Sequence, residues 1–238
     1  MARRGNPAFA VAVVAIPLAA LGYAVTGASV QIHTYVHVMT GLLWTGIDIF
    51  IGAVLGPVIG GLDDEQSAAV FERLTPKTAF LLPALAVATI AGGITLAQRL
   101  GVFPHAGVWL PLFTAANVVP ILLLFGYRMD VFRDRRWQAV FVIGTVGSLA
   151  WVATTIGEFE MTTPAIVVAL GIVTALSVQG FGFLLPGEIR MYKQMISSDP
   201  DPAIISGIGQ QNAKVGLVQG LFQLLLIADM VYLRYGGF

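Results

Sequence analysis

Seven apolar segments, separated by short polar or Pro/Gly-rich stretches, dominate the hydrophobic pattern of this chain. Each contains about 20 residues or more, which is the length that an α-helix needs to cross the hydrocarbon core of a bilayer. The pattern therefore predicts an all-α, polytopic transmembrane helical bundle that forms a single membrane domain over residues 1–238. The expected spans are 7–26, 32–60, 77–98, 107–127, 137–157, 163–186 and 204–234. The stretch 187–202 is expected to be a surface loop.

Lysine and arginine are distributed unevenly between the two sides of this seven-span arrangement, and cytoplasmic loops of membrane proteins carry the excess of both. Arg99 and Arg234 fall on one side, and Lys214 falls within the last span. The other side, which includes the N-terminus, carries Arg3, Arg4, Arg73, Lys77, Arg128, Arg133, Arg135, Arg136, Arg190 and Lys193. This asymmetry predicts a cytoplasmic N-terminus, and we expect a prokaryotic plasma membrane. The length of the first apolar run favours a retained span over a cleaved signal peptide.

The composition agrees with a lipid environment and removes several classes of function. Hydrophobic residues make up 57% of the chain and charged residues only 11%, whereas soluble domains carry roughly a quarter charged residues. Net charge is zero and no long basic run occurs, so nucleic acid is not an expected partner. The absence of cysteine excludes disulfides, iron–sulfur clusters and thiolate metal sites.

The second expected span carries a polar stripe. His33, His37, Gly41, Trp44 and Asp48 follow one another at spacings of 4, 4, 3 and 4 residues, which places them on one face of a helix. Ionisable side chains are costly in lipid, so this face is expected to point into the bundle. There it forms a candidate cofactor-binding surface, in which Gly41 allows a neighbouring helix or a planar ligand to approach closely.

Metal binding and haem binding are both open at this stripe. His33 and His37 could share one metal ion, because residues four apart lie on the same side of a helix. The seven-span arrangement brings His105, Glu158 and Asp229 to the same, outer level, where Glu160 also lies, although outer loops are commonly polar without binding a metal. Two histidines on one helix face cannot both ligate one haem. A second axial ligand would come from His105, from a methionine such as Met39 or Met161, or would be absent.

Two further polar features lie within the spans. Asp48 and Lys214 fall at similar depths, and an isolated lysine there would be costly, so we expect a buried ion pair between them. Such a pair could fix helix packing or could relay protons or ions. In the last span, Asn212 and two glutamines share a face with Gly216, and they are expected to hold helices together or to line a pocket.

Residues 36–96 resemble the start of the four-helix core in CopD-type copper-resistance proteins and HemJ-type protoporphyrinogen oxidases. The resemblance rests on His37 followed by Trp44, on Gly56-Pro57, on Phe71-Glu72-Arg73-Leu74-Thr75-Pro76, and on Pro83 to Gly92-Gly93. It implies that His37 is associated with haem b or a metal. The HemJ-type lysine that follows a Trp-Leu pair is absent, since Trp109-Leu110 leads to Phe113, so the resemblance does not carry the oxidase activity to this chain.

These features favour a haem- or transition-metal-binding integral membrane protein linked to redox chemistry or electron transfer. One alternative is a non-catalytic subunit of a larger membrane complex such as a respiratory complex, since the loops are too short to hold a soluble domain. Another is an ion- or proton-coupled transporter that uses Asp48 and Lys214. Besides the lipid bilayer, other membrane subunits or further copies of the chain are the expected partners.

Overall fold

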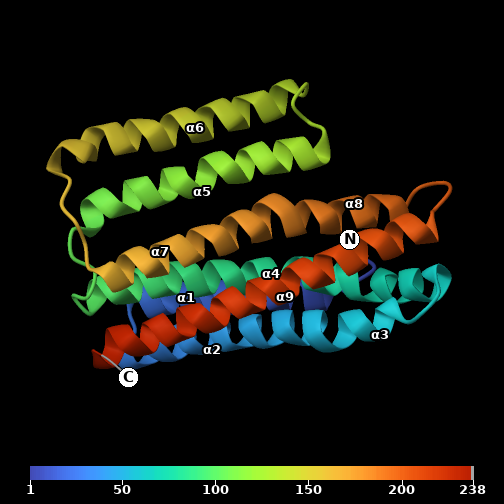
Figure 1. Ribbon diagram of the computed structural model, residues 1–238, viewed down its shortest axis with the longest axis horizontal. Coiled ribbons are helices and arrows are strands. Elements are labelled where there is room, and N and C mark those ends of the chain that lie inside the picture. Colours follow the sequence, from blue (N-terminus) through green and yellow to red (C-terminus); the bar gives the residue numbers. More distant parts are fainter. Residues whose placement is uncertain (237–238) are drawn as a thin grey trace. The chain divides into compact units, whose positions relative to one another are not determined.

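The computed structural model describes residues 1–236, and this part of the chain consists of helices and short connections without β-strands. Figure 1 shows the order of the elements. These are α1 (Pro7–Thr26), α2 (Val30–Ile49), η1 (Phe50–Leu55), α3 (Gly56–Gly60), α4 (Asp64–Arg99), α5 (Ala106–Met129), α6 (Arg135–Thr155), η2 (Ile156–Glu158), α7 (Pro164–Ser177), η3 (Val178–Leu184), α8 (Leu185–Met195) and α9 (Pro202–Tyr235).

Within residues 1–236, seven continuous helical segments are long and apolar enough to cross a membrane, which agrees with the predicted number of spans and indicates an integral membrane protein. They are Pro7–Thr26, Val30–Gly60, Asp64–Arg99, Ala106–Met129, Arg135–Glu158, Pro164–Met195 and Pro202–Tyr235. The side of the membrane on which the N-terminus lies stays a prediction.

Polar side chains at the helix starts explain why the breaks fall where they do. The Asn6 side chain accepts hydrogen bonds from the backbone N–H groups of Ala8 and Phe9. The side chains of Ser29, Thr163 and Asp201 accept bonds from backbone N–H groups in the same way at the starts of α2, α7 and α9. Such N-caps satisfy donors that the first helical turn leaves without a partner.

The sixth helical segment extends further than the hydropathy pattern indicates. A surface loop was expected from residue 187, but α8 continues to Met195 and buries Met191 and Met195. The expectation is wrong because charged residues and Pro186-Gly187 resemble a span end. Within α8 the charged side chains instead alternate with apolar side chains at helical spacing, so that one face of α8 is buried.

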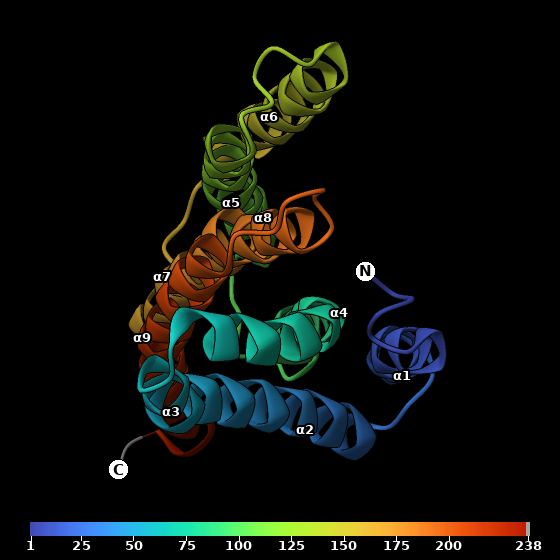
Figure 2. The ribbon, with the colours of Figure 1, turned by 90° about the vertical axis from the view of Figure 1, so that its right-hand side faces the viewer.

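The chain divides into two compact units, which the single-domain prediction did not distinguish. Unit 1 comprises Met1–Leu96 and Gly187–Leu221, and unit 2 comprises Ala97–Pro186 and Phe222–Phe238. In unit 1, α1 and α2 are joined by a short turn and pack against each other, as Figures 1 and 2 show.

Glycines let the helices of unit 1 approach closely. Three glycines at intervals of four residues face α9 from η1 and α3. A Cβ added at Gly52 would lie 2.4 Å from Cβ of Leu217, and one added at Gly56 would lie 3.1 Å from Cβ of Ala213. A Cβ at Gly60 would lie within 3.9 Å of the Gln210 side chain. This row of small residues is typical of helix packing in membranes.

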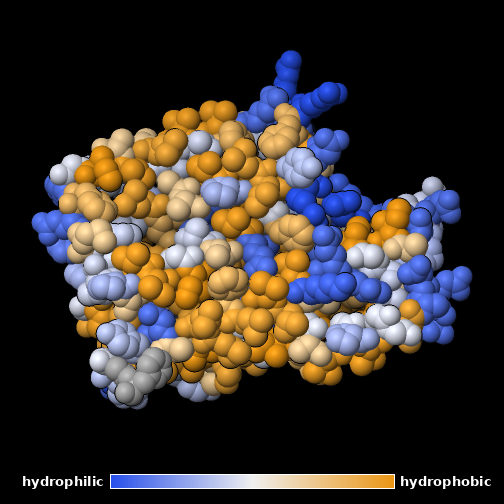
Figure 3. Space-filling view, viewed as in Figure 1, coloured by the Kyte–Doolittle hydropathy of each residue, from blue (hydrophilic) through white to orange (hydrophobic). Residues whose placement is uncertain are grey.

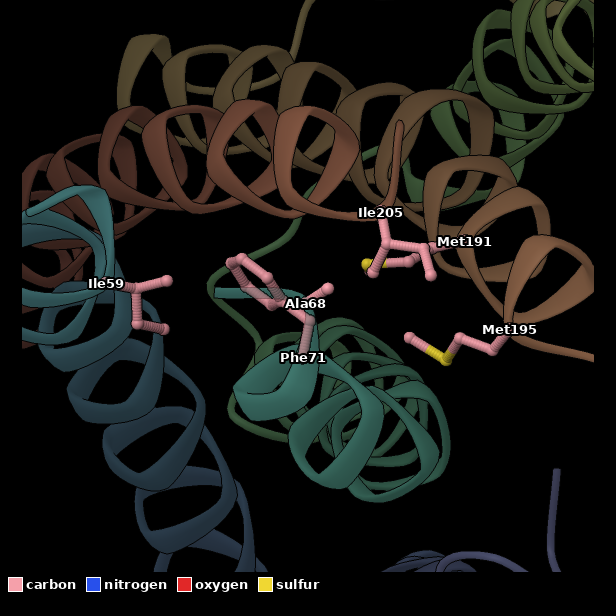
Figure 4. Close-up of a cluster of buried hydrophobic side chains, with 6 residues drawn as sticks. All are labelled: Ile59, Ala68, Phe71, Met191, Met195 and Ile205. Atoms are coloured by element: carbon pink, nitrogen blue, oxygen red, sulfur yellow. The ribbon is translucent and has the colours of Figure 1, made fainter. Parts of the chain in front are cut away.

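The apolar core of unit 1 gathers side chains from four helices. Phe71 of α4 and Met191 of α8 are 3% and 1% exposed, and Figure 4 shows them with the other buried members of the cluster. The cluster consists of Ile59, Ala68, Phe71, Met191, Met195 and Ile205. It therefore ties α3, α4, α8 and α9 together.

Unit 2 is built around α5. Helix α6 runs beside α5, and η3 packs against α5 as well. The rings of Phe125 and Trp137 stack at 5.0 Å between centroids, and the Arg128 guanidinium lies 3.9 Å from the centre of the Phe183 ring.

Large apolar side chains point outward along most helices, as the orange surface in Figure 3 shows. On α6, for example, Ile143 is 72% exposed and Val146 is 60% exposed. A water-soluble protein does not leave such continuous apolar surfaces uncovered. Their extent agrees with helices whose outer faces contact lipid.

Candidate functional site

The polar stripe of α2 faces the interior of unit 1, as its spacing predicted. His33, Trp44 and Asp48 are 1%, 3% and 2% exposed, whereas His37 and Gly41 are half-buried. Opposite the stripe lies the second half of α4. A Cβ at Gly41 would lie 3.2 Å from Cγ2 of Thr89, so the glycine serves the close approach of α2 to α4.

His33 is held by the backbone of α4. Its Nε2–H group donates a hydrogen bond of 3.0 Å to the carbonyl oxygen of Gly92, and the Thr95 hydroxyl oxygen lies 3.3 Å from the same nitrogen. Its Nδ1 atom is buried and has no hydrogen-bond partner within residues 1–236. Nε2 of His33 is thus engaged in a hydrogen bond, and Nδ1 is enclosed by protein.

His37 is held by the same helix through its other nitrogen. The Nδ1–H group donates a hydrogen bond of 3.0 Å to the carbonyl oxygen of Thr89. Because a carbonyl oxygen only accepts, this bond leaves the lone pair of the neutral ring on Nε2. The ring lies against Gly93, where an added Cβ would be 2.7 Å from Cε1 and 3.3 Å from Nε2. Gly93 therefore provides the space that the imidazole occupies.

A multi-residue metal cluster is not found in the described part of the chain. Among residues 1–236, no group of three or more His, Asp or Glu side chains is arranged to hold a metal ion. The set proposed from sequence is divided between the two units, with His33 and His37 in unit 1 and His105, Glu158 and Asp229 in unit 2, so a site shared by all five stays a prediction.

Within unit 2, two of these residues line an open hollow of about 500 Å³. His105 begins α5 in a left-handed backbone conformation with φ 57°, and its Nδ1 atom lies 3.2 Å from Oε2 of Glu160. Glu158 and Thr155 line the same hollow. The indole N–H of Trp109 donates to the Glu160 carbonyl oxygen at 3.0 Å, which fixes the connection before α7 to the start of α5. Asp229 is half-buried elsewhere in unit 2.

The two members of the expected ion pair have different environments. Asp48 is buried, whereas the Lys214 side chain is exposed at the surface of α9. Lys214 is therefore not in the buried environment that we expected for both members of the pair. Asn212, Gln219 and Gln223 on the same helix are buried, in agreement with the polar face predicted for the last span.

Glu188 is a half-buried residue with a buried Oε2 atom, and sequence reasoning missed it. Its carboxyl lies next to the side chains of Thr75, Thr78 and Asn212. The buried Oε2 atom has no hydrogen-bond partner within residues 1–236. The missed signal is the spacing of Glu188, Met191 and Met195, which lie on one helix face at intervals of three and four residues.

Comparison with known proteins does not assign the chain to a family. No protein-family model matches it, and no curated protein or solved structure is found to be similar.

Proposed function

We propose that unit 1 binds a b-type haem through Nε2 of His37 and that the chain takes part in redox chemistry or electron transfer in the membrane. The observation that carries the proposal is the hydrogen bond from His37 Nδ1–H to the Thr89 carbonyl oxygen. Histidines that ligate metals almost always donate their other ring N–H to a backbone carbonyl or carboxylate, which orients the ring and raises its basicity. His37 has this arrangement, and no hydrogen bond of its Nε2 occurs within residues 1–236.

The donor set favours haem over a bare transition-metal ion. A porphyrin supplies four nitrogen ligands, so one protein histidine suffices, whereas a bare ion in a structural site takes about four ligands from the protein. No group of three candidate ligands is found in the described residues. His33 does not compete for the iron, because its Nε2 is engaged with Gly92 and its Nδ1 is enclosed.

A haem at this position would supply one-electron redox chemistry, and the residues of the chain would control it. His37 would hold the iron from one side, and the bond to Thr89 would keep its ring from rotating. The buried surroundings of α2 would restrict water around the group, which tunes the reduction potential. The resemblance of residues 36–96 to CopD-type and HemJ-type proteins implies the same histidine.

As part of this proposal, the chain lies in a prokaryotic plasma membrane with its N-terminus in the cytoplasm, as the lysine and arginine asymmetry indicates. His33 and His37 then lie toward the outer end of α2. Because the connections are too short to hold a soluble domain, electrons would be exchanged with another membrane subunit, with a further copy of the chain, or with a lipid-soluble carrier.

Single substitutions test the ligand assignment on protein purified in mild detergent. Wild-type protein is expected to show a Soret band that shifts on reduction with dithionite, and His37→Ala is expected to lose it. His33→Gln serves as the matched control, because it removes the other histidine of the same helix face. This variant is expected to keep the band, since neither ring nitrogen of His33 is available to the iron. Metal analysis that finds copper or zinc without a Soret band would contradict haem binding. A Soret band that persists in His37→Ala would contradict the ligand assignment.

A further inference from the structure

A second polar site of unit 1 lies in the part of α4 that precedes the histidine-binding half. Thr78 and Thr89 are separated by 11 residues, or ~16 Å along a helix at 1.5 Å per residue. This site contains Glu188 of α8, Thr75 and Thr78 of α4, and Asn212 of α9, which we call the Glu188 cluster. All four residues belong to unit 1.

Independent contacts define the geometry of the Glu188 cluster. The Thr75 hydroxyl donates to Sδ of Met191 at 3.6 Å, and Met191 lies on the same face of α8 as Glu188. A Cβ added at Gly187 would lie 2.5 Å from Oδ1 and 2.7 Å from Nδ2 of Asn212. Gly187 thus allows the Asn212 amide to lie directly against the start of α8, beside Glu188.

The three neutral members of the Glu188 cluster are enclosed by protein, and Glu188 itself is half-buried with a buried Oε2 atom. Thr75, Thr78 and Asn212 are 1%, 8% and 7% exposed. The apolar cluster that contains Met191 and Phe71 adjoins it, since Met191 accepts the hydrogen bond from Thr75. The electrostatic cost of an ionised carboxylate in such surroundings is large unless a positive charge is bound nearby.

The protein itself provides no cation for Glu188. No ion pair of Glu188 occurs within residues 1–236. The nearest basic residues along α4 bind their own helix: Arg73 donates to the Ala69 carbonyl at 2.8 Å, and Lys77 donates to the Arg73 carbonyl at 3.3 Å. Both side chains are exposed. An ionised Glu188 would therefore not be balanced by a lysine or arginine.

From this arrangement we propose that the Glu188 cluster binds one small monovalent cation of the Na⁺ class. The ligands would be the Glu188 carboxylate, the hydroxyl oxygens of Thr75 and Thr78, and the side-chain oxygen of Asn212. One carboxylate balances one positive charge, and the other three ligands are neutral oxygens, which hard cations prefer. A divalent cation is less suitable, since Ca²⁺ sites use several carboxylates and Mg²⁺ retains most of its water. Ionisable groups within membrane helices commonly mark ion sites.

The test compares thermal unfolding of the purified full-length chain in NaCl, KCl and N-methylglucamine chloride at equal ionic strength. A ligand that binds only the folded state raises the midpoint, and Na⁺ at 100 times its Kd should raise it by roughly 5–10 °C over N-methylglucamine. Direct binding of ²²Na⁺ in equilibrium dialysis gives a second readout. An equal midpoint in all three salts, with no ²²Na⁺ bound, would overturn the proposal and leave Glu188 as a protonated, purely structural group.

Two variants with matched controls locate the site. Glu188→Gln removes the charge and is expected to lose both the Na⁺-dependent shift and ²²Na⁺ binding, whereas Glu65→Gln makes the same change at an exposed position and is expected to keep them. Gly187→Ala displaces the Asn212 amide and is expected to weaken ²²Na⁺ binding at least tenfold, even if Glu188→Gln does not fold. Gly207→Ala is its control, because an added Cβ there meets no atom within 4 Å. Unchanged ²²Na⁺ binding in a folded Glu188→Gln or Gly187→Ala variant would contradict the assignment.

Discussion

At the scale of single residues, the position of each imidazole depends on backbone groups of α4. His33 and His37 donate to the Gly92 and Thr89 carbonyl oxygens through different ring nitrogens. The two rings therefore differ in which nitrogen keeps its lone pair, although the residues are only four apart. This difference, more than the presence of two histidines, distinguishes His37 as the candidate ligand.

Adjacent glycines of α4 allow a sharp test of this geometry. Gly93→Ala is expected to displace the His37 ring and to lower haem content severalfold, because the new Cβ would lie 2.7 Å from Cε1. Gly92→Ala is expected to keep the haem, since its Cβ would find only ordinary contacts of 3.5 Å or more. The Soret absorbance per purified chain provides the measurement. Equal haem content in the two variants would mean that the His37 ring is not positioned by Gly93.

The residue scale also shows where sequence reasoning ends. The i, i+4 spacing predicted that the histidines share a buried helix face. In the structure His33 is buried and His37 is half-buried. Their hydrogen-bond partners lie 59 and 52 residues further along the chain. Contacts of that range depend on how α2 and α4 pack, which helical periodicity does not specify. For the same reason, the Glu188 cluster was not foreseen.

At the scale of elements, hydropathy and the polar or Pro/Gly-rich breaks predicted the spans because membrane helices are constrained in length and composition. The first span, 7–26, agrees with α1 at both ends. Hydropathy did not predict α8, where polar residues continue a helix beyond its apolar part. It also did not predict the π-helical segments η1 and η3, because an apolar run looks the same for either helix type. Such π-segments are frequent at functional sites, and η1 begins two residues after Asp48.

Close packing of η1 against α9 predicts a strong effect of one methyl group. Gly52→Ala places a Cβ 2.4 Å from Cβ of Leu217 and 2.7 Å from its backbone atoms, so the helices must separate. We expect a loss of about 1–3 kcal/mol, as is typical for overpacking. Gly46→Ala, on an exposed part of α2 with no atom within 4 Å, is expected to be neutral or slightly stabilising. Thermal unfolding in detergent measures both, and similar midpoints for the two variants would contradict the packing of η1 on α9.

At the scale of the whole molecule, seven apolar segments leave most of their large side chains on the outside, which requires lipid or other membrane subunits as surroundings. The charge pattern predicts the orientation, with the N-terminus inside. Within unit 1, two polar sites of different chemistry occupy different parts of α4. One presents an imidazole nitrogen, and the other presents oxygen atoms around a carboxyl group.

The orientation is testable because the chain has no cysteine of its own. Ser198→Cys and Leu100→Cys each introduce a single exposed thiol, at connections predicted to be cytoplasmic and external, respectively. In intact cells a membrane-impermeant maleimide is expected to label Cys at position 100 and not at position 198. Both should react after the cells are opened. The reverse pattern would place the N-terminus outside and would put the histidine site toward the cytoplasm.

Haem binding by the wild-type chain is the central claim, and a reduced-minus-oxidised visible spectrum tests it most directly. The protein is expressed with haem supply, purified in mild detergent, and measured before and after dithionite, with haem quantified as its pyridine complex. The account predicts a shifted Soret band, sharpened bands in the visible region on reduction, and about one haem per chain, as expected for a single His37 ligand. A folded, colourless protein that takes up no haem would contradict the account.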